Sequence, residues 1–326
     1  MGGDRGPGEI VAGAVDAALD GVTPVLFGPR GLDTLGLELV EAAETITMKE
    51  KPAEAVRAKP DSSLVLACRA VARGEADVVV SAGNTGAMLA AGLLELRRLR
   101  GVLRPAIAVP LPARGRPSVM LDCGANADAR PEHLLQFAHM GSIFAEEILE
   151  LRRPEVRLLS IGEEQGKGNQ LTLEAHRLLA ADAELGFGGN AESRHLLDRA
   201  ADVIVCDGFT GNICLKAIEG TILNVLSSLG EELRRSRRGK VGGVLVRPAA
   251  RALRARFDPD THGGAYLLGL RRLAVIAHGN SSREAIANAV HVAARGVQHR
   301  VVERLAERFE GRVVASAGSG PRATPK

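Results

Sequence analysis

The chain is poor in aromatic residues. Its 326 residues include no tryptophan, one tyrosine (Tyr266) and seven phenylalanines. Proteins that bind single-stranded nucleic acid without sequence preference stack the bases on aromatic side chains, and this chain lacks such platforms. Its formal net charge of +3 is also too small to indicate a polyanionic partner. We therefore expect no nucleic acid among its ligands.

Cysteine is scarce and forms no motif. Cys68, Cys123, Cys206 and Cys214 show no C-x-x-C spacing, so neither a zinc site nor a redox pair is indicated. They suit buried positions in a reducing cytosol. Because H-E-x-x-H and EF-hand spacings are missing as well, we expect no metal and no other cofactor.

Motifs of covalent catalysis and of membrane insertion are also missing. The sequence has no G-x-S-x-G elbow and no cysteine with a nearby histidine, which disfavours a nucleophilic enzyme. No apolar run reaches the length of a membrane-spanning helix, and the N-terminus does not resemble a signal peptide. We therefore expect a cytoplasmic protein, and 45% hydrophobic residues are enough for a sizeable core.

One segment is present twice. Residues 76–86 (ADVVVSAGNTG) and 201–211 (ADVIVCDGFTG) are identical at seven of eleven aligned positions. Each is a β-branched run, a glycine-containing turn and the start of a helical stretch, an arrangement that surrounds an anion with backbone N–H groups. Two ordinary strand–turn–helix units would look similar. Asn84, Thr85 and Asp207, however, are polar where a turn needs only glycine, which favours a cleft with two walls.

Strand and helix patterns alternate along the chain. Strands are expected at 24–28, 44–48, 77–81, 106–111, 118–122, 156–161, 202–206 and 273–277. Helices are expected at 8–20, 61–73, 84–98, 131–150, 168–181, 211–229 and 282–310. This alternation predicts a mostly parallel sheet with helices on both faces. We assign residues 1–310 to one catalytic domain and expect 311–326 to be a flexible tail.

Polar loops follow five of the expected strands. They begin at Ser81, Asp122, Gly162, Asp207 and His278. Because ligands of open α/β sheets bind outside the carboxyl ends of the strands, these loops predict a polar catalytic cleft. The loop 162–169 is no Walker A motif, since three residues separate its first two glycines, and this disfavours a nucleoside triphosphatase.

Each charged group in these loops also has an ordinary structural interpretation. Lys167 can hold an oxyanion or can be a solvated loop lysine. Lys216 lies one helical turn after Asn212, so both can face the cleft, although a helix lysine is often simply exposed. His278 can be a general acid or phosphate donor, or it can cap the next turn. Strand-end aspartates such as Asp207 can orient lysines and hydroxyls or can cap loops.

Taken in order, the loops resemble the PlsX family of fatty acyl phosphate synthases (phosphate:acyl–acyl-carrier-protein acyltransferases). The resemblance rests on the following segments: Met1–Asp4 with Pro7, Asp61–Ser63, Ser81–Ala87, Arg104–Pro105, Asp122–Asn126, Pro131–Ala138, Gly162–Asn169, Cys206–Asn212 with Lys216, Gly263–Ala265, and His278–Gly279 with Ser282. It covers nearly the whole chain to about residue 297.

The resemblance implies that an acyl–carrier-protein thioester reacts with inorganic phosphate to give acyl phosphate for bacterial phospholipid synthesis. It implies a three-layer α/β/α fold like that of phosphate acetyltransferases and isocitrate dehydrogenases, and a homodimer. The candidate catalytic residues are Lys167, Lys216, Asn212, Asp207 and His278. The candidate substrate- and phosphate-binding residues are Gly83, Asn84, Thr85, Gly86, Asp122, Asn126, Glu163, Gly166, Gly168, Asn169, Gly208 and Gly279.

The chain departs from the family pattern at its N-terminus. Family members usually have a β-strand leading into the Met-Gly-Gly-Asp motif, whereas this sequence begins at that methionine. We expect the true start to lie upstream. The family also usually has histidine after the aspartate, where this chain has Arg5.

The regular alternation stops at residues 231–258, which are rich in arginine and predict a basic amphipathic helical hairpin. The arginines at 234, 235, 237 and 238 could steer an acidic carrier protein. Alternatively, Val244, Leu245 and Val246 could enter anionic lipid while arginines contact headgroups, as the resemblance favours. A solvated hairpin without either role is the third interpretation.

Three other functions fit parts of the pattern. A coenzyme A-dependent phosphate acetyltransferase would share the fold and the anion-binding loops. A non-catalytic membrane-surface scaffold would need only the hairpin and would leave five polar loops without a purpose. A decarboxylating dehydrogenase would need magnesium carboxylates, and Asn126 stands where a second aspartate would be expected after Asp122.

Overall fold

The computed structural model describes residues 3–257 and 259–318. The strands are β1 (Val25–Gly28), β2 (Glu38–Glu41), β3 (Val78–Ser81), β4 (Ala106–Leu111), β5 (Ser118–Leu121), β6 (Glu155–Ser160), β7 (Gly186–Glu192), β8 (Val203–Val205), β9 (Ala265–Leu268) and β10 (Leu273–Ile276). The helices are α1 (Pro7–Leu19), α2 (Pro52–Ala58), α3 (Ser63–Arg73), α4 (Thr85–Ala91), α5 (Pro131–Ile148), α6 (Gln170–Ala181), α7 (Gly208–Arg234), α8 (Arg237–Phe257), α9 (Pro259–His262), α10 (Arg283–Gln298) and α11 (Val301–Gly318). A π-helical turn (Gly92–Leu96) follows α4, and a 3₁₀ turn (Ser193–Asp198) follows β7.

Eight strands form one sheet in the order β3-β10-β9-β4-β5-β8-β6-β7, and β1 and β2 form a separate parallel pair. Strands β3 and β10 are parallel, and so are β5, β8, β6 and β7. Three antiparallel pairings connect these two groups through β9 and β4. The two parallel groups therefore run in opposite directions.

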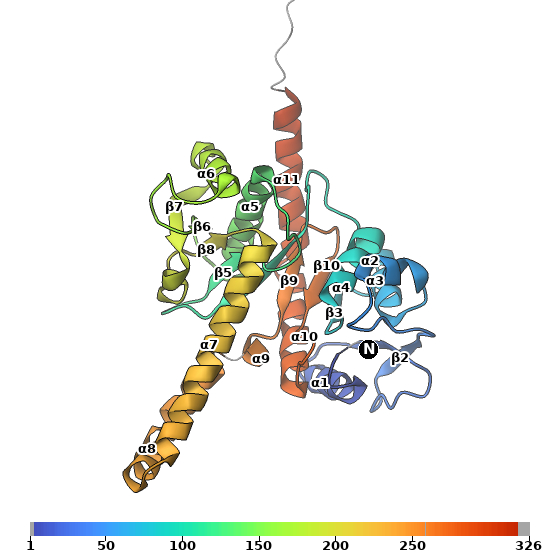
Figure 1. Cartoon of the computed structure of the whole chain (residues 1–326). Helices are drawn as coiled ribbons and strands as arrows, with labels where there is room; N and C mark the ends of the chain where they lie inside the picture. The colour runs from blue at the N-terminus through green and yellow to red at the C-terminus, as the bar shows by residue number, and fades with distance from the viewer. Residues whose placement is uncertain (1–2, 258, 319–326) are drawn as a thin grey trace, which may run out of the picture.

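Side chains of the central strands alternate between two apolar layers, as the period of two in a strand requires. Val119, Leu121 and Val203 belong to the core cluster that α5, α10 and α11 cover, whereas Met120 and Ile204 belong to the cluster that α3 and α4 cover. The predicted three-layer α/β/α architecture is thus confirmed (Figure 1).

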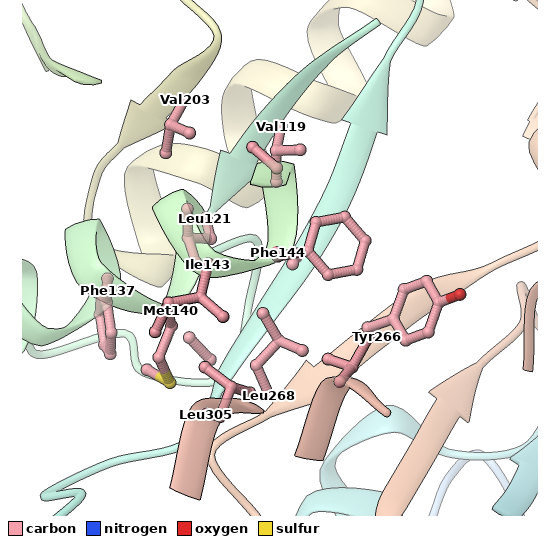
Figure 2. Close-up of a cluster of buried hydrophobic side chains, with 14 of the residues drawn as sticks. Val119, Leu121, Phe137, Met140, Ile143, Phe144, Val203, Tyr266, Leu268 and Leu305 are labelled. Atoms are coloured by element: carbon pink, nitrogen blue, oxygen red, sulfur yellow. The ribbon is translucent and has the colours of Figure 1, made fainter. Parts of the chain in front are cut away.

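Aromatic packing closes the first of these layers (Figure 2). Phe144 of α5 meets Tyr266 of β9 edge to face, with ring centroids 4.8 Å apart, a geometry that adds to the burial energy. The Tyr266 hydroxyl donates to the backbone oxygen of Val292 in α10, so its only polar group is satisfied inside the core. Burial raises the pKa of Tyr266 to about 12.

One predicted strand is wrong and three strands were missed. The segment 44–48 forms only an isolated bridge, between Glu44 and Ser62, because β2 lies earlier and pairs with β1. The missed strands are β2, then β7, whose sequence GFGGNAE is rich in glycine, and β9, which follows α9 after the basic segment. Glycine is depleted in strands, and this is why β7 does not look like one.

The C-terminal helical stretch differs from its prediction in two ways. It divides near Arg300, whose φ of +52° interrupts the helical backbone, so α10 ends at Gln298 and α11 begins at Val301. The two helices follow one another end to end in Figure 1. Helix α11 then continues to Gly318, beyond the expected start of a flexible tail at residue 311. The rest of that expected tail, 319–326, lies outside the described residues.

The basic segment 231–258 does not form a hairpin by itself, because among its described residues it contains only the end of α7 and the single helix α8. The hairpin consists of α7 and α8, so its first arm is the helix that was predicted separately at 211–229. Figure 1 shows both helices projecting from the body of the protein. Helix α7 has 27 residues and is apolar enough, by length and composition alone, to cross a membrane. The sequence analysis missed this property. Because α7 packs on β5 at one end and pairs with α8 at the other, we interpret it as an arm of the hairpin.

Three of the four cysteines lie inside the protein, as predicted. Cys68, Cys123 and Cys206 are buried, Cys214 is half-buried, and all four are free thiols. Burial raises the pKa of Cys68 to about 12, with a smaller contribution from the charge of Glu95. Thiols of this kind are protonated at neutral pH and unreactive.

A cavity of about 710 Å³ separates the small sheet from the large one. Val25 and Phe27 of β1 line one side, and Val78 and Val80 of β3 line the other. Each strand has a neighbour on one side only, so both present free backbone groups toward the cavity. Gly3 lies beside Ala82, just after β3 ends. The cavity therefore lies between two free strand edges of the described residues, beside the N-terminal loop.

The carboxylate of Asp122, at the end of β5, organises the loop that carries it. This side chain is completely buried. One oxygen accepts from the backbone N–H groups of Ile107, Gly124 and Ala125, and the other accepts from the backbone and side-chain amides of Asn126. Burial raises the pKa of this carboxyl, and these N–H donors act against that shift.

The same interaction places the start of α7. The backbone oxygen of Asn126 accepts from Gly208 N–H at 2.8 Å. A Cβ at Gly211 would lie 2.0 Å from the carbonyl oxygen of Asp122, so only glycine allows the first turn of α7 to approach this closely. Asp122 therefore joins β4, β5 and α7.

An N-terminal extension of about six alternating apolar residues is expected to raise the unfolding temperature, because filling the cavity removes apolar surface from water at about 25 cal/mol per Å². Differential scanning calorimetry of extended and unextended chains measures this. A Gly/Ser extension of equal length is the control, and equal melting of the two extended chains would contradict the expectation.

Asp122→Asn is expected to lower the free energy of unfolding by about 2–3 kcal/mol, because an NH₂ group would then face buried N–H donors. Urea unfolding followed by circular dichroism measures the loss. Asp128→Asn, six positions further along on an exposed side chain, is the matched control. An unfolding free energy as high as that of the control would show that the buried carboxylate is unimportant for stability.

Candidate functional site

The five polar loops do not meet at one edge of the sheet, which differs from the prediction. The loops after β5, β6 and β8 lie at one edge. The loops after β3 and β10 lie at the opposite edge, because those strands run in the other direction. The two copies of the repeated segment therefore form two separate groups, and another element has to connect them.

Helix α7 makes this connection. It starts at the end of β8, and Asn212, Lys216 and Glu219 follow on it at i, i+4 and i+7, which is one helical face. Asn212 lies beside Gly124 of the Asp122 loop. Further along, the charges of His278 and Lys216 lower the pKa of half-buried Glu219, although burial raises it overall. The face of α7 thus reaches from the first group of loops to the second.

Glu219 is a candidate site residue that the sequence analysis missed. The signal was present, since Glu219 continues the helical stripe that begins with Asn212 and Lys216. It was overlooked because the analysis considered only the residues directly after each strand. Its carboxylate lies close enough to Lys216 and His278 for both to lower its pKa.

The amide of Asn84 has a structural role in the loop after β3. Its side-chain oxygen caps α4 by accepting from Ala87 N–H at 3.0 Å, and its NH₂ group donates to the backbone oxygens of Met48 and Glu50. Gly83 N–H donates to Ser81 Oγ. A Cβ at Gly86 would lie 2.6 Å from the ring of Pro52. These predicted ligand-binding groups hold the loop itself, while Thr85 remains exposed.

The loop after β10 is held by the N-terminal loop. Asp4 N–H donates to the backbone oxygen of Gly279 at 2.7 Å, and Arg5 Nε donates to Asn280 Oδ1 at 2.9 Å. A Cβ at Gly279 would lie 2.9 Å from an Asp4 carboxylate oxygen. His278 is exposed next to this contact.

Asp207 and Gly208 also have structural partners. The Asp207 carboxylate caps α7, where it accepts from the backbone N–H and the hydroxyl of Thr210 at 2.9 and 2.7 Å. A Cβ at Gly208 would lie 2.7 Å from an Asp122 oxygen. Asp122 and Asn126 are buried in their own network, so their predicted contact with substrate is replaced by a role in loop geometry.

The loop 162–169 presents Lys167 to solvent. Ser160 Oγ donates to the Lys167 backbone oxygen at 2.9 Å, and Asn169 caps α6 by accepting from Thr172 N–H at 3.0 Å. Gly168 has a φ of +125°, and a Cβ there would lie 2.0 Å from Thr172 Oγ1. Glu163 and Gly166 are exposed beside Lys167.

Lys167, Lys216 and His278 remain available for a ligand, and Glu163 and Glu164 are also exposed in the loop that carries Lys167. The polar atoms of Asp122, Asn126, Asn84 and Asp207 are engaged inside the protein. Lys167, Lys216 and His278 are exposed, and in the part of the chain that the structure describes none of them forms an ion pair within 4.0 Å. Exposed cations such as these two lysines attract an anion.

Solved structures with similar folds support this architecture. A phosphotransacetylase from Streptococcus pyogenes aligns with a TM-score of 0.60 at 17% identity, over 91% of this chain and 92% of that chain. A branched-chain phosphotransacylase from Enterococcus faecalis V583 aligns with a TM-score of 0.59 at 18% identity, over 91% of this chain and 97% of that chain. At these identities the likeness shows the fold.

Sequence relatives are much closer. The profile of the family described as "Fatty acid synthesis protein" matches residues 1–304. A phosphate acyltransferase from Heliobacterium modesticaldum is 45% identical over 325 residues, which cover 96% of this chain and 97% of the relative. Another, from Thermosynechococcus vestitus, is 45% identical over 317 residues, which cover 94% and 92%. The chain therefore belongs to this family, the PlsX phosphate acyltransferases.

Proposed function

We propose that this member of the phosphate acyltransferase family takes a long-chain fatty acyl group from the thioester of acyl carrier protein and transfers it to inorganic phosphate. The products are free carrier thiol and acyl phosphate for phospholipid synthesis. The observation that supports the proposal best is that the cations of Lys167 and Lys216 and the imidazole of His278 remain exposed, while the carboxylates of Asp122 and Asp207 are engaged internally.

These cations suit phosphate as the nucleophile. At neutral pH phosphate is already an anion, so a phosphate oxygen can attack the thioester carbonyl without a strong general base. An O–C bond forms, the C–S bond breaks, and the leaving thiolate takes up a proton from solvent or from an acid such as His278. The enzyme has to hold one anion and to donate hydrogen bonds to the carbonyl oxygen, which becomes negative in the tetrahedral intermediate.

We assign the binding roles to the exposed groups. Lys167 would hold phosphate, and Lys216 with Asn212 would face the carbonyl oxygen from α7. Thr85 would contribute a hydroxyl from the opposite edge of the sheet. Glu219, whose carboxylate interacts with Lys216 and His278, would orient these two side chains.

The hairpin would bring the enzyme to its lipid partner. Val244 and Leu245 of α8 are 70% and 77% exposed, and α8 carries basic residues such as Arg251 and Arg254 along its length. Exposed apolar residues among arginines suit the boundary of an anionic membrane. We propose a cytoplasmic protein that binds this surface peripherally and that functions as a homodimer.

Lys167→Ala is expected to reduce phosphate-dependent turnover by about 100-fold or more, because the attacking phosphate would lose the cation that positions it, and a misplacement of about 1 Å can cost about 100-fold. Release of carrier thiol from palmitoyl–carrier protein, with the acyl group trapped as a hydroxamate, measures turnover. Arg177→Ala, which removes an exposed charge on α6, is the control. Turnover near the control's would remove Lys167 from the site, and release from acetyl-coenzyme A instead would favour a phosphate acetyltransferase.

The double change Val244→Glu and Leu245→Glu is expected to abolish co-sedimentation with vesicles of phosphatidylglycerol and phosphatidylethanolamine, because two charges would replace the apolar contact. The control makes the same replacement at two exposed leucines far from the hairpin, Leu19 and Leu35. Equal lipid binding by both double variants would discard the hairpin as the membrane contact.

A further inference from the structure

Strand β7 contains a bulge that directs one of its side chains. Along the β6–β7 pairing Val156 lies opposite Phe187 and Leu158 lies opposite Asn190, so β7 has one extra residue in this stretch. The extra residue belongs to the glycine pair 188–189. Gly189 has a φ of +93°, and a Cβ at Gly188 would lie 2.4 Å from a Glu155 carboxylate oxygen. Such bulges change the direction of the next side chain.

The side chain placed by this bulge is Asn190, and both ends of its amide have partners. Its NH₂ group donates to the backbone oxygen of Glu164 at 2.9 Å, and its oxygen lies 2.9 Å from His176 Nδ1. Asn190 and His176 are only 2% and 8% exposed. Since the amide oxygen can only accept, His176 donates this hydrogen bond. The His176 ring packs edge to face on Phe187 at 5.1 Å, which fixes its orientation.

The bond to Glu164 reaches the turn that carries Lys167. The same Glu164 oxygen accepts from Lys167 N–H at 3.0 Å and closes the turn 164–167. At the other end of this turn, Ser160 Oγ donates to the Lys167 oxygen at 2.9 Å. The turn is therefore attached to the sheet on one side by β6 and on the other by β7, and the exposed lysine projects from a fixed backbone.

We propose that Asn190, oriented by His176, is a positioning residue that sets where Lys167 meets the phosphate. The proposal rests on the role of Lys167 in the proposed function. Asn190 touches neither substrate nor the reacting atoms. It acts through the Glu164 carbonyl, whose displacement would move the lysine away from the anion. Burying the polar side chains of Asn190 and His176 costs free energy even though they hydrogen-bond each other. Their role in holding the turn 164–167 explains why both are present.

The test is a double-mutant cycle with Asn190→Leu, Lys167→Ala and the variant that combines them. Asn190→Leu keeps the side-chain size and removes both hydrogen bonds. We expect it to lower kcat/KM for phosphate by about 10- to 100-fold, as displacements of about 1 Å do. If Asn190 acts through Lys167, the double variant will be no slower than Lys167→Ala alone. Multiplied effects, or an unimpaired Asn190→Leu, would overturn the proposal.

A second variant keeps the test decisive if Asn190→Leu does not fold. His176→Phe keeps the contact with Phe187 and removes the donor that orients Asn190, so we expect a smaller loss that again disappears in the Lys167→Ala background. Arg177→Ala, at the next position of α6, is the control. A His176→Phe enzyme with the control's kcat/KM for phosphate would overturn the proposal.

Chemical labelling separates failure of this inference from failure of the proposed function. Acetic anhydride labels exposed lysines, and mass spectrometry gives the rate at Lys167 with and without inorganic phosphate. We expect phosphate to slow labelling in the wild type and not in Asn190→Leu. If phosphate protects Lys167 equally in both proteins, the inference is overturned, whether or not the wild type releases carrier thiol. If the wild type releases no carrier thiol, the proposed reaction alone is refuted.

Discussion

The buried carboxylate of Asp122 is the interaction on which the arrangement of the first wall depends. A charge without solvent is tolerated only when hydrogen bonds replace its hydration, and five N–H groups from β4 and from its own loop do so here. The loop that supplies them has one possible geometry. Through Asn126 it also receives Gly208, so the first turn of α7 is placed by the same charge.

This network also determines how much negative charge faces the candidate site. If Asp122 and Asp207 faced the cleft, two carboxylates would repel a phosphate anion. Instead Asp122 is buried under N–H donors and Asp207 caps a helix. The same residues that hold the loops thus remove negative charge from the surface, and the lysines keep their effect on an anion. Structural and electrostatic requirements are met by one choice of residues.

Much of the fold could be predicted from local sequence patterns, whereas the relative directions of its strands could not. A continuous apolar run such as Val119, Met120 and Leu121 indicates a strand buried on both faces, and this prediction is confirmed. Whether β3 and β5 run the same way depends on β9, an insertion between them in the sheet that no local pattern reveals. The expectation that all five loops share one edge failed for this reason.

The candidate site shows a similar division. Residue type identified Asn84, Asp122 and Asp207 as special, but an N-cap and a ligand contact need the same side chains, and only the three-dimensional partners distinguish them. Glu219 and Asn190 were missed for a different reason. Glu219 lies three turns into a helix, and Asn190 lies in a glycine-rich bulge that does not resemble a strand. Their roles come from contacts between elements distant in sequence.

Helix α7 connects the Asp122 loop, the two groups of polar loops and the hairpin. Its first turn is placed by Asp122, its next turns carry Asn212, Lys216 and Glu219 past both groups of loops, and its far end pairs with α8 in the hairpin. At 1.5 Å per residue, its 27 residues extend about 40 Å. A helix of this length is stiff over its packed part, so a hairpin bound to a surface, as we propose, would also set the orientation of the candidate site toward it. An enzyme whose product carries an apolar chain benefits from that geometry, because the product leaves beside the phase in which it dissolves.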